Sequence, residues 1–259
     1  MKTSIKSALL LSAVLSGSAM LATAPARAAA PVDSDTTVVL VHGAFADGSS
    51  WDQVIPLLQA KGVKVVAVQN PLSSLAADVA ETQRVVDAQT GKVVLVGHSW
   101  GGAVITQAGS SDKIKALVYV AAFAPSEGES LGSVGKDYPT PPGIPTLKPA
   151  AAGGYIDLPS DSYIQNFAQD VPVARARVLA TLQGLFPAKS FGEPITYAAW
   201  KNKPNYYIVA NNDRMIDPGL ERAFAKKLNA VTTTVNSSHV PMLSQPQVVA
   251  DVIMNAVQR

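Results

Sequence analysis

The sequence predicts an α/β protein built on a mostly parallel, doubly wound sheet of about six strands. The first observation is that short β-branched runs, such as 36–41 (TTVVLV), alternate with segments of helical pattern along much of the 259 residues. Continuous apolar strands are typical of sheets buried on both faces, and strand–helix alternation is typical of parallel sheets. The second observation is a stretch, 125–203, that has no clear strand and indicates a small helical cap inserted into this fold.

The composition supports a protein with a sizeable core. Hydrophobic residues make up 47% of the chain and charged residues 15%, which excludes disorder or a coiled coil over the whole length. The chain has no cysteine, so disulfides, thiolate metal sites and a cysteine nucleophile are excluded. Only three histidines occur, and a histidine-rich metal site is therefore not expected.

Residues 1–28 have the pattern of a cleaved signal peptide. Two lysines precede an apolar run over 8–15, and Ala26-Arg27-Ala28 supplies a cleavage site. A transmembrane anchor is the alternative, but the run is short and rich in serine and glycine. Cleavage would remove three basic residues and no acidic one, leaving 18 basic against 19 acidic residues, a formal net charge of −1. We therefore expect an exported protein, periplasmic or secreted, with no membrane span in its mature form and no nucleic-acid partner.

The individual elements follow from the same patterns. Strands are expected where β-branched and apolar residues run together, at 36–41, 63–68, 92–96, 116–121, 206–210 and 231–235. Helices are expected between them and after the last one, at 51–60, 75–88, 103–109, 218–228 and 246–257. Asp217 followed by Pro218 is a good helix start, a capping side chain and then proline at the first helical position. These elements assign 29–124 and 204–259 to the core domain.

The segment 125–203 is too long for an ordinary loop of a compact domain. It contains a cluster of prolines between 139 and 149, followed by Gly153-Gly154. Either short helices packed over one end of the sheet or a disordered linker could account for it. Aromatic residues favour the packed cap, because they are rare in disordered segments: Tyr155, Tyr163, Phe167, Phe186, Phe191 and Trp200.

A nucleophile motif lies directly after the strand expected at 92–96. The residues 97–101 read GHSWG and precede an expected helix, which is the context in which G-x-S-x-G predicts a nucleophilic serine. The serine must stand on a strained turn above the sheet, and a side chain at Gly97 or Gly101 would collide with the neighbouring strand or helix. We therefore predict that Ser99 is the nucleophile.

A serine nucleophile needs a base and an acid that orients the base. His239 is the only histidine after Ser99 and lies between the last strand and the last helix, so it is the predicted base. Asp213 is the first choice for the acid, because it follows the strand at 206–210 and precedes the histidine in the chain. Glu127, after the strand at 116–121, and Asp217, which is better explained as a helix cap, are the alternatives.

The oxyanion hole needs two backbone N–H groups. One is expected from Trp100, the residue after the nucleophile, and the other from the loop that follows the first strand. Ala44 is the first choice in that loop and Phe45 the alternative. We interpret His42, at the start of the loop, and His98, beside the nucleophile, as structural residues.

The ordered set HGAF, GHSWGG, NNDRMI and SSHVPML resembles the α/β-hydrolase superfamily across essentially the whole mature chain. The segments VHGAFADGSSW, LVYVAAFAP and SHVPMLSQP are most similar to the compact branch that contains plant methyl esterases and hydroxynitrile lyases, to which many small bacterial esterases are similar. The resemblance implies a triad of Ser99, Asp213 and His239, with Ala44 and Trp100 as oxyanion donors. It also implies no cofactor and a helical cap that shapes the substrate pocket.

Two departures from the branch point away from lyase chemistry. Its hydroxynitrile lyases carry a lysine next to the catalytic histidine, where this chain has Val240. They also tend to have a hydroxyl residue in the first loop, where this chain has Ala44. A dehalogenase is excluded, because that chemistry needs aspartate at position 99.

The function expected from these residues is hydrolysis of carboxylic esters of small apolar or aryl substrates through an acyl-enzyme. A lactonase, or a cofactor-free perhydrolase or haloperoxidase, would use the same triad and is the alternative. A homologue that binds ligand without turnover is disfavoured, because the chain keeps all three triad residues. The expected partner is therefore a small-molecule ester.

Overall fold

The computed structural model describes residue 1, residues 35–151 and residues 153–259. The signal peptide predicted at 1–28 lies outside the described residues except for its first one. Within the described part, no helix is long and apolar enough to cross a membrane.

Six strands form one sheet in the order β2-β1-β3-β4-β8-β9, and every neighbouring pair is parallel. The four inner strands are buried almost throughout, which explains their continuous apolar sequences. The strands are β1 (Thr37–Val41), β2 (Lys64–Ala67), β3 (Val93–Ser99), β4 (Ile114–Ala122), β8 (Asn205–Ala210) and β9 (Val231–Val235). The predicted α/β class and the six strands are confirmed, with ends that differ from the expected ones by at most three residues.

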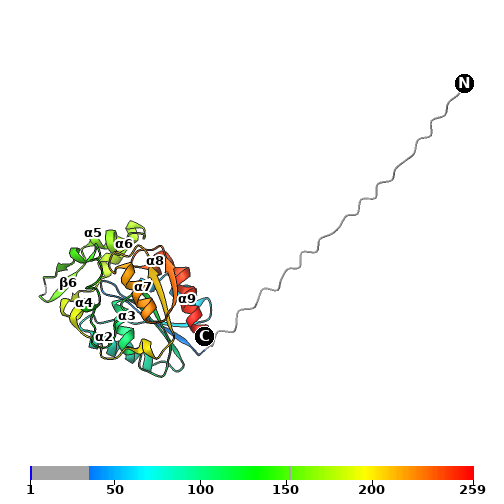
Figure 1. The fold of residues 1–259 in the computed structure, drawn as a ribbon, viewed down its shortest axis with the longest axis horizontal. Helices are drawn as coiled ribbons and strands as arrows, with labels where there is room; N and C mark the ends of the chain where they lie inside the picture. Colours follow the sequence, from blue (N-terminus) through cyan, green and yellow to red (C-terminus); the bar gives the residue numbers. More distant parts are fainter. Residues whose placement is uncertain (2–34, 152) are drawn as a thin grey trace. The chain divides into compact units, whose positions relative to one another are not determined.

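Helices cover both faces of this sheet (Figure 1). They are α1 (Ile55–Gln59), α2 (Leu75–Asp87), α3 (Trp100–Ala108), α7 (Pro218–Lys227), α8 (Pro241–Ser244) and α9 (Pro246–Gln258). The connection from β1 to β2 runs toward one edge of the sheet, whereas the later connections, from β2 to β3 and on to β9, run toward the other edge. Because crossovers between parallel strands are right-handed, α1 lies on one face of the sheet and α2, α3 and α7 lie on the other. Because α9 contacts α1, β3, β4 and β8, it covers the same face as α1.

One predicted helix is shorter than expected. The sequence indicates a helix over 51–60, but the structure has a 3₁₀ turn, η1 (Gly48–Trp51), and then only α1. The Asp47 side chain caps η1 and accepts the Ser49 N–H at 2.8 Å. The helical pattern is therefore split between two short elements. Asp217 caps α7 as predicted and accepts the N–H groups of Gly219 and Leu220.

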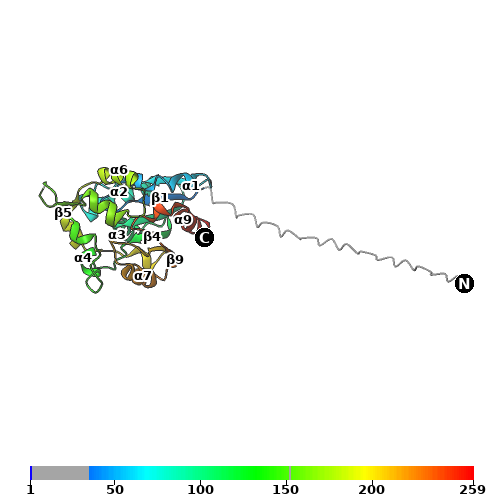
Figure 2. The same cartoon turned by 90° about the horizontal axis from the view of Figure 1, so that it is seen from above.

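Most of the described part of the segment 125–203 lies at the end of the molecule away from the carboxyl terminus (Figure 2). Its helices are α4 (Leu131–Val134), α5 (Ser160–Ser162), α6 (Val173–Leu182) and the short elements η2 (Ile144–Thr146), η3 (Tyr163–Phe167), η4 (Ala188–Gly192) and η5 (Ala199–Lys201), of which η3 is a π-helical turn. Three of its aromatic residues are buried in the same core cluster as the sheet: Tyr163, Phe167 and Phe186. The described part of the segment is therefore packed against the core.

The expectation of a cap without strands is wrong in one respect. A small antiparallel sheet joins β5 (Lys148–Pro149), β6 (Tyr155–Asp157) and β7 (Phe186–Pro187). Each strand has only two or three residues, and β7 pairs with a segment some thirty positions earlier in the chain. Such strands depend on long-range pairing and leave no local sequence pattern.

Candidate active site

The predicted site residues lie after strands whose carboxyl ends share one edge of the sheet. Ser99 ends β3, Asp213 follows β8, His239 follows β9, and Ala44 follows β1. Because all six strands are parallel, these loops meet above the same edge. Most of the described part of the segment 125–203 lies over this end of the core (Figures 1 and 2).

Ser99 stands on a strained turn between β3 and α3. Its backbone has φ 52° and ψ −119°, a conformation that costs free energy in a non-glycine residue. The turn is possible because its neighbours are glycines. A Cβ at Gly97 would lie 2.5 Å from the Gly101 carbonyl oxygen, and a Cβ at Gly101 would lie 2.6 Å from the Val41 carbonyl oxygen. The geometry is that expected of a nucleophile on a sharp turn at the start of a helix.

Asp213 and His239 form a buried pair. His239 Nδ1 lies 2.5 Å from Asp213 Oδ2, and both side chains are at most 1% exposed. Asp213 Oδ1 accepts the backbone N–H groups of Met215 at 2.6 Å and Ile216 at 2.9 Å. These donors fix the carboxylate, which in turn holds His239 with a proton on Nδ1 and a free lone pair on Nε2.

Ser99 and His239 line the same small cavity of about 30 Å³. In the described part of the chain, no direct hydrogen bond joins the Ser99 hydroxyl to the imidazole. The cavity is large enough for about two water molecules, and catalytic hydrogen bonds commonly tighten only when substrate is bound. The arrangement therefore brings the predicted nucleophile and base to one space.

The alternative acids have other partners. Glu127 forms an ion pair with Lys201, and its Oε1 accepts the Ala198 N–H at 2.9 Å. The hydrogen bond from Lys201, helped by that N–H, lowers the pKa of Glu127 to about 2. Asp217 is occupied with capping α7. Of the three candidates, Asp213 is the one that contacts His239.

The two residues considered for the loop donor, Ala44 and Phe45, line the small cavity together with Ser99 and Trp100. Phe45 has a φ of 58°, so this loop is also held in a strained conformation. Both loop residues therefore remain candidates for the second oxyanion donor beside Trp100.

The Trp100 side chain is anchored by Asp78, a residue of α2 that sequence reasoning missed. The indole N–H donates to Asp78 Oδ2 at 2.7 Å, and the Leu72 N–H donates to Oδ1 at 2.8 Å. Asp78 is fully buried, and burial raises its pKa to about 6. A signal existed in the sequence, because Asp78 lies on the apolar stripe of α2, with Leu75, Val79 and Thr82.

His42 and His98 make hydrogen bonds that fit the structural role expected of them. The His42 Nδ1–H group donates to the Gly43 carbonyl at 2.8 Å, and Nε2 accepts the Asn70 N–H at 2.9 Å, so the neutral ring fixes the loop. The His98 Nε2–H group donates to the backbone carbonyl of His239 at 2.8 Å. Burial lowers the pKa of both rings. His98 thus holds the loop of the candidate base.

The cap also holds this loop, through Asp170, which sequence reasoning did not single out. Asp170 Oδ2 accepts the Ser238 N–H at 2.7 Å, one residue before His239. The neighbouring Gln169 side chain donates to the Asn212 carbonyl at 2.7 Å, one residue before Asp213. No local pattern marks Asp170, since its role depends on a contact across 68 positions of the chain.

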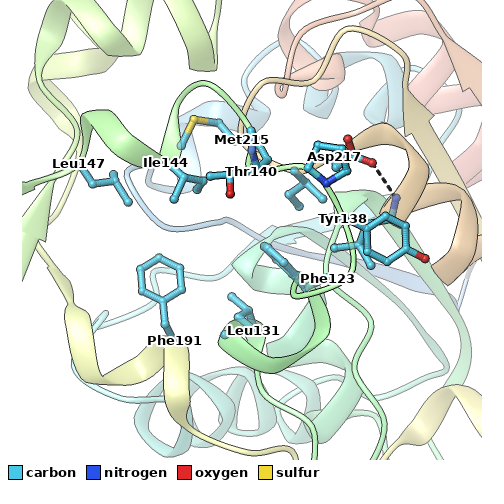
Figure 3. A pocket seen from close by; sticks show the side chains of 15 residues that line it. Phe123, Leu131, Tyr138, Thr140, Ile144, Leu147, Phe191, Met215 and Asp217 are labelled. Atoms are coloured by element: carbon cyan, nitrogen blue, oxygen red, sulfur yellow. Dashed lines mark hydrogen bonds between the residues drawn. The ribbon is translucent and has the colours of Figure 1, made fainter.

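A larger apolar pocket of about 280 Å³ adjoins the small cavity (Figure 3). In Figure 3 the side chains of Leu131, Phe191 and Ile144 point into this space, below and beside Met215. Among the described residues, no lysine, arginine or histidine lines this pocket, and the one carboxylate that does, Asp217, accepts the Leu220 N–H of its own helix. The two cavities share six lining residues: Phe123, Leu131, Ile144, Phe191, Met215 and Ile216.

Within residues 35–151 and 153–259, no group of three or more His, Asp or Glu side chains is arranged to hold a metal ion.

Known proteins resemble this chain over most of its length. Methylesterase 2 of Arabidopsis thaliana is 28% identical over 247 residues, covering 82% of this chain and 92% of that protein. A pyrethroid hydrolase of Sphingobium wenxiniae is 27% identical over 244 residues, covering 84% and 86%. The crystal structure of polyneuridine aldehyde esterase superposes with a TM-score of 0.75 at 21% identity, covering 85% of this chain and 98% of that one. The model of the alpha/beta hydrolase family matches residues 38–252. The chain belongs to the alpha/beta hydrolase family.

Proposed function

We propose that the protein is a serine hydrolase that cleaves carboxylic esters through an acyl-enzyme. The observation that carries this proposal is the buried His239–Asp213 pair. His239 lines the same cavity as Ser99, which stands on a strained turn. The relatives named methylesterase and pyrethroid hydrolase support ester hydrolysis as the reaction class.

The reaction that this geometry supports has two stages. His239 Nε2 accepts the Ser99 proton while Oγ attacks the ester carbonyl, and the imidazolium formed is stabilised by Asp213. The carbonyl oxygen becomes an anion that accepts hydrogen bonds from the N–H groups of Trp100 and of Ala44 or Phe45. His239 then gives the proton to the leaving alcohol. A water molecule, deprotonated by the same imidazole, then attacks the acyl carbon. The bond to Ser99 Oγ breaks, the imidazolium returns its proton to Oγ, and the acid is released.

The cavities support a neutral, apolar ester as substrate. The space beside Ser99 holds little more than the reacting carbonyl group, so one side of the ester must extend into the adjoining pocket. That pocket is lined by Leu131, Ile144, Leu147 and Phe191, and none of its described lining residues carries a cationic group to bind an anionic substrate. Burial of an aliphatic chain or an aromatic ring there would supply most of the binding free energy.

A p-nitrophenyl ester series from acetate to palmitate tests the proposal. We expect the protein to hydrolyse medium-length esters and Ser99→Ala to lose this activity while it keeps the fold. Ser73→Ala is the matched control, because Ser73 is an exposed serine that lines neither cavity. Absence of hydrolysis by the folded protein, or equal activity of Ser99→Ala, would contradict the proposal.

We also propose that residues 1–28 direct export and are then removed. The support is the sequence pattern alone, with its basic start, apolar run and Ala26-Arg27-Ala28 site. Expression of the full chain in a Gram-negative host, followed by N-terminal sequencing of the exported protein, tests it. We expect a new terminus at Ala29. An unprocessed chain that stays in the cytoplasm would refute the proposal.

A further inference from the structure

A second carboxyl group lies against Asp213. Glu221, in the first turn of α7, is fully buried and lies close to Asp213, because both residues bond to Ala210: the Asp213 N–H donates to the Ala210 carbonyl at 3.2 Å, and the Ala210 N–H donates to Glu221. Glu221 Oε2 accepts the Ala210 N–H at 2.9 Å. Its buried Oε1 receives no hydrogen bond from an N–H or O–H group of the described residues.

The donors around the two carboxyl groups are unequal. Asp213 accepts two backbone N–H groups and the His239 ring, which together stabilise a negative charge. From the described part of the chain, Glu221 accepts a single N–H. A second buried negative charge in contact with the first would be strongly unfavourable, as in other carboxyl pairs that share one proton.

The other groups that face Glu221 do not compensate such a charge. Arg222, its neighbour in α7, is exposed and donates to the Asn211 side chain. Tyr207, in β8, is buried and donates its hydroxyl to the Ala122 carbonyl. His239 is already paired with Asp213. Burial and the adjacent Asp213 raise the pKa of Glu221 well above its usual range.

We propose that Glu221 keeps its proton at neutral pH and donates it as a hydrogen bond to Asp213, which makes Glu221 a positioning residue for the acid of the triad. This inference rests on the proposed function, because it takes Asp213 as that acid. The proton is not transferred during the reaction. It gives the Asp213 carboxylate a further hydrogen bond and so helps to hold Asp213 in the geometry that orients the imidazole.

Two substitutions separate this role from simple packing. Glu221→Gln keeps the size, a carbonyl oxygen for the Ala210 N–H and an N–H donor for Asp213. Glu221→Met keeps the length but removes both polar functions. We expect Glu221→Gln to keep kcat within about threefold, and Glu221→Met to lower kcat about tenfold or more with KM unchanged. A folded Glu221→Met variant with the kcat of the parent protein would refute the positioning role.

Infrared spectroscopy at neutral pH tests the proton directly and does not depend on activity. We expect the C=O band of a protonated carboxyl group in the parent protein, its loss in Glu221→Gln, and no change in Glu81→Gln, a control at a half-buried carboxylate that pairs with Arg84. A difference spectrum without this band would show that Glu221 is ionised and overturn the inference. If Glu221→Met does not fold, the infrared comparison decides alone. If the protein hydrolyses no ester, the proposed function fails while the band still reports on Glu221.

Discussion

Replacing Asp213 by asparagine tests the assignment of the acid through its hydrogen bonds. Asp213 Oδ1 accepts two backbone N–H groups, from Met215 and Ile216, so the single carbonyl oxygen of an asparagine would take that position. Its NH₂ group would then face His239 Nδ1, where Asp213 Oδ2 now lies at 2.5 Å. Two donors cannot face each other, so the ring must carry its proton on Nε2 instead, and the base loses its lone pair.

The expected loss follows from that change of tautomer. In a serine protease the same substitution lowers kcat by about 10⁴, which corresponds to about 5.5 kcal/mol of transition-state stabilisation. We expect a loss of this order here, measured as kcat for p-nitrophenyl butyrate, with a thermal midpoint close to that of the parent protein. Asp217→Asn and Glu127→Gln serve as controls and are expected to keep activity. An Asp213→Asn variant within tenfold of the parent, or a large loss in Glu127→Gln, would refute the reasoning.

Three further predictions concern the turn, the anchor of Trp100 and the pocket. Gly101→Ala places a Cβ 2.6 Å from the Val41 carbonyl oxygen and should cost about 1–3 kcal/mol of unfolding free energy, measured in urea, together with activity. The pKa of Asp78 is about 6 in the folded protein, against an ordinary value of 3.8, so the folded state keeps this proton to a higher pH than the unfolded state does. Stability should therefore fall as pH rises from about 4 to about 6, by about 3 kcal/mol, and Asp78→Asn should lose this slope in urea unfolding. Leu147→Asp, in the larger pocket only, should raise KM for long esters about tenfold and leave that for acetate nearly unchanged; equal effects on both would contradict the pocket assignment.

The sheet and the strained turn at Ser99 could be predicted because their signals are local. The inner strands are buried on both faces and so read as continuous apolar runs. The turn at Ser99 requires glycines at fixed positions, and its context of strand and helix is visible in the sequence. The candidate base could be chosen by elimination, because His239 is the only histidine after Ser99 in the sequence.

The remaining parts depend on contacts between distant segments. The choice between Asp213 and Glu127 as the acid depends on which carboxylate contacts His239. Asp213 does so, whereas Glu127 forms an ion pair with Lys201, which is 74 positions away in the chain. Glu221 could have been noticed as an acidic residue on the apolar stripe of α7, with Phe224 and Ala225, but the group that it faces is known only from the fold. The hydrogen bond from the Ser238 N–H to Asp170, which holds the loop before His239, is likewise known only from the fold.

The most direct test of the central claim is to trap the acyl-enzyme. The protein would be mixed with a p-nitrophenyl ester, quenched in acid during turnover and analysed by intact and peptide mass spectrometry. We predict a mass increase of one acyl group on the peptide that contains Ser99, absent in Ser99→Ala. Turnover without such an adduct in the parent protein, or an adduct on another residue, would contradict a mechanism in which Ser99 attacks the ester.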